Sequence, residues 1–524
     1  MHDATGGRRA GVLIPLFSCT GTTSWGIGDI GDLVAVTAWL AAAGQRALQL
    51  LPINEMAPNE ESPYSAISAM AIDPLFISLA SVADFPGEES LSSDDRALLA
   101  RVRQSRTIDY AGVRPLKRRA LQTAFELFVK DEWRRDTVRS RAFREFLAAQ
   151  AWWIDDYALF RAIHAREDER PWTEWPERLQ RRDPAVLADA RRELSTDVLF
   201  YQYLQWLAHT QWRQARERAK GVAMLGDLPF MVDRDSADVW ARQDQFRLDA
   251  SVGAPPDAFS ATGQDWGMPV YRWDAVAHDD FRWLRERARR NAELYDGFRI
   301  DHLVGFYRTY GRPRDGGEAF FTPAEEPDQL ALGERVLAVF REPGAVVIAE
   351  DLGIVPDFIR ASLQRLGVPG FRVFRWERKW HTEGQPFRDP SEYPAASVAT
   401  SGTHDTETMA AWWESATNEE RRQVADLPAV RQLTGDVSEL LDGTYSPAVR
   451  DVLLELLFAS GSDLTLLPVQ DVFGWRDRIN EPGRVIASNW TFRLRWPVDR
   501  LDEVPEARER QASLRSWSQK HGRI

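Results

Sequence analysis

Residues 345–350, Ala345-Val346-Val347-Ile348-Ala349-Glu350, form a short apolar run that ends in a carboxylate, and this pattern recurs along the chain. A short apolar run bounded by polar residues is typical of a strand that is buried on both faces of a parallel sheet. Seven more such runs lie at residues 12–17, 47–53, 222–228, 297–301, 370–374, 397–400 and 464–469. We therefore expect eight buried strands.

Helical patterns separate most of these runs. In residues 32–43, for example, Asp32 offers a cap at the start and Gly44 follows the last periodic residue. Strands that alternate with helices indicate a parallel sheet, and eight such units close into a barrel. The predicted fold class is α/β, a (β/α)₈ TIM barrel with further loop insertions over its cleft.

One gap between the runs is far too long for a single crossover helix. Residues 76–220 are rich in Arg, Glu, Ala, Leu and Trp at helical spacing, and polar turn residues at 84–95 connect the barrel to this segment. We expect residues 76–220 to form an inserted, mainly helical subdomain after the second strand. Residues 1–75 and 221–524 then form the barrel.

Composition and charge exclude several functional classes. The 524 residues are 44% hydrophobic and 28% charged, as in an ordinary globular protein, and the net charge is -13. Because nucleic-acid binding depends on a basic face that neutralises phosphates, this acidic balance argues against a nucleic-acid partner. A neutral substrate fits better.

Cysteine and histidine usage argues against an intrachain disulfide and against a metal site. Cys19 is the only cysteine, and the eight histidines show no H-E-x-x-H spacing. We expect no metal, no cofactor and a cytoplasmic location. Arg8 and Arg9 before the apolar residues 10–17 imitate an export signal, but no cleavage pattern follows, and no run approaches the ~18 apolar residues of a membrane span.

Polar groups at the ends of the predicted strands are the candidate catalytic residues, because the carboxyl ends of barrel strands form the active face. Arg299 and Asp301 lie two residues apart and therefore point to the same side of a strand. A guanidinium beside a carboxylate keeps that carboxylate ionised, as a nucleophile requires.

Two further carboxylates end the neighbouring runs. Glu350 has no such partner in the sequence, so we expect it to hold a proton near neutral pH and to act as general acid and then base across the barrel mouth from Asp301. Asp405 follows the seventh run beside His404. Such carboxylates around one pocket are typical of glycoside chemistry, in which retention places the acid and the nucleophile ~5–5.5 Å apart.

Each of these residues also has an ordinary structural interpretation. A single Asp or Glu at a strand end is more often a helix cap or a solvated loop charge. His302 and His404 are equally compatible with a supporting role behind the carboxylates. The joint occurrence of carboxylates at three strand ends is the observation that favours catalysis.

Many separate motifs in the right order, between Pro15 and Arg493, resemble the amylomaltase or disproportionating-enzyme family, glycoside hydrolase family 77. They are Ser24-Trp25-Gly26-Ile27-Gly28-Asp29, Ser62-Pro63-Tyr64, Gly226-Asp227-Leu228-Pro229, Asp235-Ser236-Ala237-Asp238-Val239-Trp240, Pro255-Pro256-Asp257, Phe259-Ser260-Ala261-Thr262-Gly263-Gln264, Trp266-Gly267, Phe298-Arg299-Ile300-Asp301-His302, Ala349-Glu350-Asp351-Leu352-Gly353, Thr403-His404-Asp405-Thr406, Gln470-Asp471 and Asn480-Glu481-Pro482-Gly483. The resemblance implies a 4-α-glucanotransferase that moves α-1,4-glucan segments between maltooligosaccharides, amylose or glycogen-derived chains.

The resemblance also implies roles for residues. Asp301 would be the nucleophile, Glu350 the acid/base and Asp405 the carboxylate that grips and distorts the donor sugar. Arg299, Tyr64, Asp227 and His404 would line the same subsite, with Gln264, Trp266, Phe259 and Asn480 as further sugar-binding residues. An amide side chain in a loop is at least as often a turn residue as a ligand-binding one. Gln264 and Asn480 are therefore also compatible with a purely structural role in a turn.

The resemblance implies that the barrel is the catalytic domain and that residues 251–271 form a flap loop over its cleft. This flap departs from the family pattern at three positions. Ala258 stands where the family usually has a tyrosine, Met268 where an asparagine is usual and Asp265 where a basic residue is common. A missing aromatic ring removes a stacking surface for a sugar. We expect acceptor binding or the ratio of transfer to hydrolysis to differ.

Three other functions are weighed against glucan transfer. Residues 26–31 match G-x-G-x-x-G of a dinucleotide site, with Glu55 after the next run, but they begin about eight residues beyond Phe17 and so miss the strand tip. An α-glucan hydrolase would use the same carboxylates and let water attack. A glucan-binding protein without catalysis would not need Arg299, Asp301, Glu350 and Asp405 together.

Overall fold

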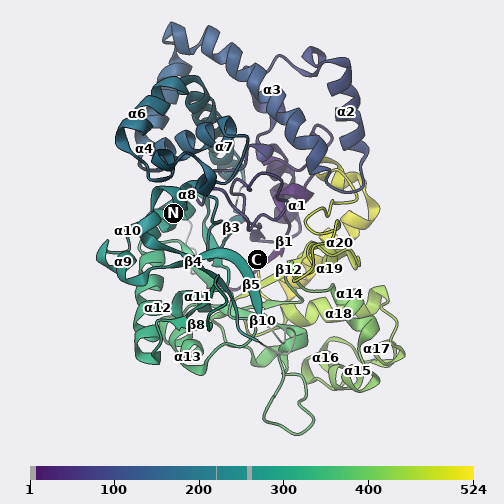
Figure 1. Cartoon of the computed structure of the whole chain (residues 1–524). Helices are drawn as coiled ribbons and strands as arrows, with labels where there is room; N and C mark the ends of the chain where they lie inside the picture. Colours follow the sequence, from purple (N-terminus) through teal and green to yellow (C-terminus); the bar gives the residue numbers. More distant parts are fainter. Residues whose placement is uncertain (1–6, 220, 257–262) are drawn as a thin grey trace.

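The structure is a computed structural model that describes residues 7–219, 221–256 and 263–524. Eight parallel strands close into a barrel in the order β1-β12-β11-β10-β9-β6-β3-β2 (Figure 1). Their bounds are β1 Arg9–Leu13, β2 Ala47–Gln49, β3 Ala223–Leu228, β6 Gly297–Ile300, β9 Val346–Ala349, β10 Gly370–Val373, β11 Ser397–Thr400 and β12 Leu464–Pro468. Each contains part of one predicted run, so the TIM-barrel prediction is confirmed.

The first strand lies earlier than predicted. β1 begins at Arg9 rather than at residue 12, and the chain after Leu13 turns into a short 3-10 helix at Leu16–Ser18. Pro15 lacks the N–H that a central strand needs, which ends the ladder. The apolar residues after Arg9 thus form a barrel strand paired with both β2 and β12.

Parallel register brings the strand ends together at one edge. Asp227 on β3 pairs with Arg299 on β6, and Ile300 pairs with Ala349 on β9. Asp301 and Glu350 are therefore the next residues of adjacent strands. The barrel interior beneath them is filled by one inward residue from each of six strands, namely Ala47, Leu225, Ile348, Phe371, Val398 and Leu466.

Helices cover the outside of the barrel. Those on the barrel itself are α1 Leu33–Ala42, α8 Ala237–Ala241, α9 Trp273–His278, α10 Arg282–Leu294, α11 Val304–Tyr307, α12 Glu326–Arg341, α13 Asp357–Leu366, α14 Met409–Ser415, α15 Asn418–Ala425, α16 Pro428–Leu433, α17 Ser438–Asp442, α18 Pro447–Phe458, α19 Val469–Phe473 and α20 Pro505–Lys520. Residues 374–396, all of which are described, join β10 to β11 without an α-helix. Among the described residues, no helix is long and apolar enough to cross a membrane.

The predicted end of α1 is confirmed, but the predicted cap at its start is wrong. Gly44 follows the helix with a positive φ of 71°, as a terminating glycine should. Asp32 does not cap α1, however, because its carboxylate accepts hydrogen bonds from the Asp29 N–H at 2.9 Å and the Ser24 hydroxyl at 2.7 Å. It closes the turn before the helix instead.

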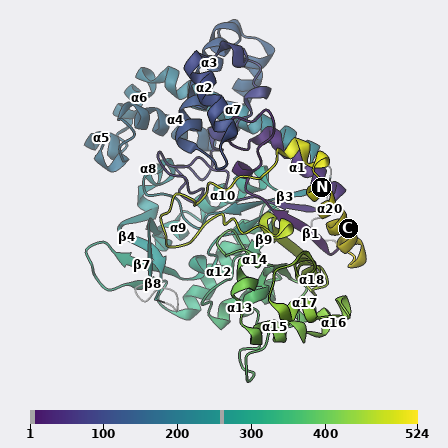
Figure 2. The same cartoon turned by 90° about the vertical axis from the view of Figure 1, so that its right-hand side faces the viewer.

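A helical insertion between β2 and β3 is present, as predicted. It contains α2 Ser93–Gln104, α3 Tyr110–Asp131, α4 Val138–Arg166, α5 Glu177–Gln180, α6 Pro184–Glu193 and α7 Ser195–Arg218. Figures 1 and 2 show these helices gathered together on one side of the barrel. The last of them, α7, also contacts the barrel, where the Trp212 indole N–H donates to the Leu294 carbonyl at 2.7 Å. It is the crossover helix that returns the chain to β3.

A second sheet was not predicted. Four antiparallel strands, β4 Phe246–Ala254, β5 Gln264–Tyr271, β7 Thr309–Pro313 and β8 Phe320–Thr322, lie in the order β5-β4-β7-β8. In Figure 2 this sheet lies on the side of the barrel opposite to α20. The expected flap loop is therefore largely a hairpin of β4 and β5.

Candidate active site

Arg299 organises the bottom of the site from β6. Its guanidinium contacts the Asp301 carboxylate at 2.8 Å and the two oxygens of Asp227 at 2.8 and 2.7 Å. The Tyr64 hydroxyl donates to the same Asp227 at 2.8 Å. Asp227 and Tyr64 thus hold the arginine beside Asp301, whose side chain is 28% exposed.

Glu350 ends β9 in a different environment. Its carboxylate accepts the backbone N–H of His302 at 2.8 Å and that of Leu352 at 3.0 Å. Burial raises its pKa to about 7, with Arg299 opposing the shift and the negative charge of Asp301 adding to it. A carboxyl with a pKa near neutrality can both donate and accept a proton.

The relative position of the two carboxylates corrects one expectation. Glu350 was expected to face Asp301 across the barrel mouth, but β6 and β9 are neighbouring strands. The His302 N–H, which follows Asp301 directly, reaches Glu350. The two carboxylates thus follow neighbouring strands at one edge of the mouth.

Asp405 follows β11 and is held from three directions. Asn480 donates its side-chain amide to one carboxylate oxygen at 2.7 Å, His404 lies 3.2 Å from the other, and Arg478 donates to the backbone carbonyl at 2.9 Å. Burial opposes ionisation, but the charge and hydrogen bonds of His404 and the bond from Asn480 lower the pKa of Asp405 to about 2. Asp405 is therefore an anion at any working pH.

Aromatic rings join these two groups of residues. Tyr64 stacks on His404 with ring centres 5.2 Å apart, and Trp490 packs against both rings at 5.7 and 5.8 Å.

Trp490 and Arg478 were not predicted from the sequence, because both lie in the long connection after β12 rather than at a strand end. Their only signal was proximity in sequence to Asn480.

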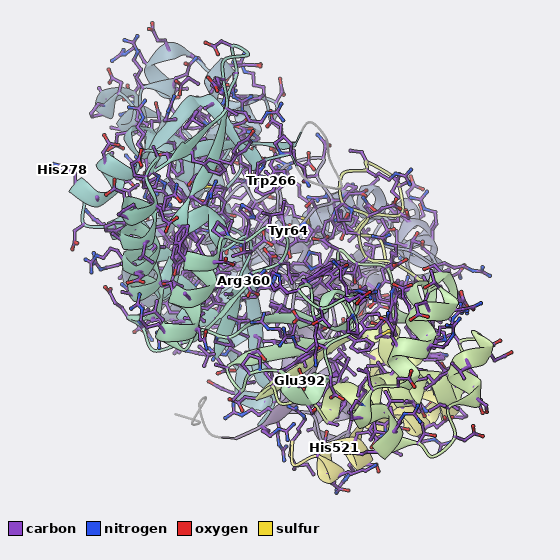
Figure 3. The ribbon with its side chains drawn as sticks, turned by 90° about the horizontal axis from the view of Figure 1, so that it is seen from below. Tyr64, Trp266, His278, Arg360, Glu392 and His521 are labelled. Atoms are coloured by element: carbon purple, nitrogen blue, oxygen red, sulfur yellow. The ribbon has the colours of Figure 1, made fainter. Side chains whose placement is uncertain are left out.

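The hairpin of β4 and β5 brings Trp266 to the site. Its ring packs edge-on against His302 at 4.8 Å, and its indole N–H donates to Gln264 at 3.0 Å. Figure 3 shows Trp266 and Tyr64 in the middle of the molecule, far from His278 and His521 at its edges. Phe259 and Ala258 lie outside the described residues. Asp265 accepts the Gly267 N–H at 2.9 Å and closes the turn after Trp266.

His302 is a supporting residue. Burial lowers its pKa to about 4, so the ring is neutral at physiological pH, and Phe230 packs against its edge at 5.7 Å. Its backbone has a positive φ of 43°. This left-handed conformation turns the chain directly after the strand and lets the His302 N–H reach Glu350.

Asp351 has a structural role, unlike the catalytic role proposed for the neighbouring strand-end carboxylates. It accepts the Phe371 N–H at 2.8 Å and lies 3.3 Å from Arg372, so it links the end of β9 to the start of β10.

The glycine-rich residues 26–31 also have a structural role. A Cβ on Gly28 would lie 2.1 Å from the Leu16 carbonyl, so this glycine allows the loop to pack on itself. Among the residues that the structure describes, no group of three His, Cys, Asp or Glu side chains could hold a metal ion.

A closed parallel barrel with three carboxylates at the ends of β6, β9 and β11 defines a glycoside-processing enzyme. The model of one family, described as 4-alpha-glucanotransferase, matches residues 14–499. The chain is 32% identical to the 4-alpha-glucanotransferase of Chlamydia pneumoniae over 501 residues, covering 94% of this chain and 92% of that one. It is 33% identical to the 4-alpha-glucanotransferase of Thermus thermophilus, covering 90% and 92%.

A solved structure agrees with this similarity. Amylomaltase from Streptococcus agalactiae in complex with acarbose matches with a TM-score of 0.82 and 28% identity, over 98% of this chain and 99% of that one. The chain belongs to the 4-alpha-glucanotransferase family, glycoside hydrolase family 77, whose members include the amylomaltases. Its activity is 4-alpha-glucanotransferase activity on α-1,4-glucans. The resemblance drawn from the sequence motifs is confirmed.

Proposed function

We propose that the chain transfers α-1,4-glucan segments by a retaining double displacement in which Asp301 is the nucleophile and Glu350 the acid/base. Asp301 attacks the anomeric carbon while the Glu350 carboxyl gives its proton to the departing glycosidic oxygen. The C–O bond to the leaving chain breaks as the bond to Asp301 forms. Glu350 then takes a proton from the 4-hydroxyl of an acceptor chain, which attacks the same carbon and releases Asp301.

One observation carries this proposal. Adjacent strands present two carboxyls with opposite surroundings, one 2.8 Å from a buried guanidinium and one buried on backbone N–H groups with its pKa raised to about 7. Two carboxyls whose environments separate their protonation states are what acid and nucleophile roles require.

Asp405 is proposed as the group that grips the donor sugar. It stays ionised with a pKa of about 2, and its side chain is 40% exposed, so its oxygens reach the cleft. An anion fixed by Asn480 and His404 can accept hydrogen bonds from two neighbouring sugar hydroxyls and stabilise positive charge that develops on the ring. Arg299, Tyr64, Asp227 and His404 complete this subsite.

The substrates proposed are maltooligosaccharides, amylose and glycogen-derived α-1,4-glucans, each serving as donor and as acceptor. Trp266 offers a partly buried ring at the mouth and Gln264 a polar group beside it. A ring over the site displaces water while a sugar acceptor stacks on it, which favours transfer over hydrolysis. Phe259 and Asn480 stay predicted substrate contacts.

The domain division is proposed as the sequence indicated it, with a helical subdomain at residues 76–220 and a barrel made of residues 1–75 and 221–524, including the flap at 251–271. The packing of α4 against α7 and of α2 against α3 supports this helical unit. A cytoplasmic location stays a prediction from cysteine usage.

Incubation with maltotriose separates transfer from hydrolysis. We expect glucose together with a ladder of maltooligosaccharides longer than the substrate, resolved by chromatography. Transfer conserves the number of glycosidic bonds, so total reducing ends should stay constant. Shorter sugars alone, with rising reducing ends, would show an α-glucan hydrolase instead.

A further inference from the structure

A cavity lies apart from the carboxylates, between the loop that follows β2 and the helical insertion. Its volume is about 290 Å³, and it is lined by residues 55–59 and 73–75 and by side chains from α3, α4 and α7. None of the residues assigned above to donor binding or catalysis lines it. The volume is near the lower end of the range of small-molecule sites, roughly 300–1,000 Å³.

The charge of the lining is unlike that of the whole chain. Four cationic side chains, Arg114, Lys117, Arg118 and Arg161, line the cavity together with three carboxylates. The chain as a whole carries a net charge of -13. A cationic excess inside a cavity of an acidic protein is a feature that attracts an anionic ligand.

The three carboxylates are already occupied by protein donors. Asp73 accepts the Leu75 N–H at 2.8 Å and the Met56 N–H at 3.1 Å. Glu55 accepts from Arg161 at 3.0 Å and from the Tyr157 hydroxyl. Glu169 accepts from Arg161 at 3.0 Å and lies 2.6 Å from a ring nitrogen of His164. Burial raises the pKa of Asp73, and the nearby charge of Arg114 opposes that shift.

Two of the cations keep donors available. Lys117, which is only 1% exposed, donates to the Leu75 carbonyl at 2.6 Å, and the nearest carboxylate oxygen, on Asp29, is 3.9 Å away. Arg114 donates one N–H of its guanidinium to the Glu60 carbonyl and lies 3.9 Å from the Met56 sulfur. Within the described residues its other N–H groups have no carboxylate partner. An ammonium and a guanidinium with spare donors suit a phosphate.

The opposite wall is apolar and aromatic. Leu121 from α3 and Phe200, Tyr201 and Leu204 from α7 line it. The Arg161 guanidinium already lies over the Tyr201 ring, 5.0 Å from its centre, so Leu121, Phe200 and Leu204 form the apolar surface. Such a wall favours a compact ring rather than a free ion, because a ring can pack against aromatic side chains while the anionic group contacts the cations.

We propose that this cavity binds the phosphate ester of a small sugar, with the phosphate on Arg114 and Lys117 and the sugar ring against Leu121, Phe200 and Leu204. This site is independent of the carboxylate chemistry proposed above. Because its lining comes from both the barrel loop and the insertion, the occupant would bridge the two and stabilise the folded protein.

Isothermal titration calorimetry on the full chain tests the proposal with glucose 6-phosphate, inorganic phosphate and glucose. We expect glucose 6-phosphate to bind and to raise the melting temperature. Arg114→Gln and Lys117→Met should each weaken that binding about tenfold or more, since each removes a charged hydrogen bond. Arg119→Gln is the matched control, because Arg119 lies on the same helix but pairs with Asp95 at the surface.

Folding and transfer activity are checked in every variant by circular dichroism and maltotriose turnover, and Arg118→Gln replaces Lys117→Met if that buried change prevents folding. Glucose 6-phosphate binding that is lost only in the cavity variants supports the proposal. Binding that Arg114→Gln leaves unchanged overturns it, and so does the absence of binding. Inorganic phosphate or glucose binding there as tightly as the ester overturns the assignment of the class of ligand.

Discussion

Glu350 accepts hydrogen bonds from two backbone N–H groups, whereas the neighbouring Asp301 contacts the guanidinium of Arg299. The two side chains have the same functional group and end adjacent strands, so the difference between them comes from their surroundings. Burial raises the pKa of Glu350 to about 7, although Arg299 opposes the shift. The proposed division between acid and nucleophile therefore rests on the residues that surround each carboxyl.

Glu350→Gln tests that division directly. A glutamine has nearly the same shape but cannot deliver a proton, so we expect kcat/KM for maltotriose to fall at least about 100-fold while substrate binding persists. Product chromatography and binding calorimetry measure the two effects. Glu342→Gln, at a surface pair with Arg285, should retain the normal rate. Full activity in Glu350→Gln would remove this residue from the acid role.

The pH profile follows from the same carboxyl. In the proposed mechanism Glu350 must be protonated for the first step, and burial raises its pKa to about 7. The active fraction is therefore complete at lower pH and is lost as the pH rises through 7, so kcat/KM should fall about tenfold per pH unit above that point. Initial rates from about pH 5 to pH 9 at constant ionic strength measure this limb.

His404 offers another source of a pH dependence near neutrality. Burial lowers its pKa, but the Asp405 charge and hydrogen bond raise it above its usual value. The residual rate of Glu350→Gln distinguishes the two, because a limb due to Glu350 disappears in that variant. A limb that persists unchanged would belong to His404.

At the scale of elements, the strands and the active-face carboxylates could be predicted because both leave a local signal. An apolar run marks a buried strand wherever it occurs, and Asp301 or Glu350 directly follows one. The sheet of β4, β5, β7 and β8 left no such signal, because its strands have mixed burial and pair across long separations. Trp490 was missed for the same reason, since it joins Tyr64 and His404 only through tertiary packing.

Trp266 tests the role of the β4–β5 hairpin. Trp266→Ala removes the ring that packs against His302, so water gains access and an acceptor sugar loses a stacking surface. We expect transfer to fall about two- to tenfold, the range of an aromatic contact, and the hydrolytic share to rise. Reducing ends counted against oligosaccharide products give that ratio. Asp249→Asn, an exposed change on β4, should leave it unaltered, and an unaltered ratio in Trp266→Ala would contradict the role.

At the scale of the whole molecule, α7 packs against both the rest of the helical insertion and the barrel. The Trp212 ring from α7 packs edge-on against Tyr295 at 5.7 Å, and its indole N–H bonds the Leu294 carbonyl. Tyr295 in turn lies against β3 at Gly226, next to Asp227, which is proposed to line the donor subsite. Helical insertion, barrel wall and active face thus share one packed contact.

Gly226→Ala should disturb that contact. A Cβ at this position would lie 2.3 Å from the Tyr295 ring, and the ring cannot move away freely because Trp212 packs against it. Overpacking of this kind costs about 1–3 kcal/mol. At an unfolding entropy of about 2.1 cal/mol/K per residue, a chain of 524 residues should lose about 1–3 °C in melting temperature. Differential scanning calorimetry measures the shift against Gly435→Ala, where a Cβ would meet nothing within 4 Å.

Because α7 packs against both the insertion and the barrel, we expect the whole unfolding transition of Gly226→Ala to shift to lower temperature. If only a barrel transition shifts while the insertion melts at its original temperature, α7 does not couple the two parts.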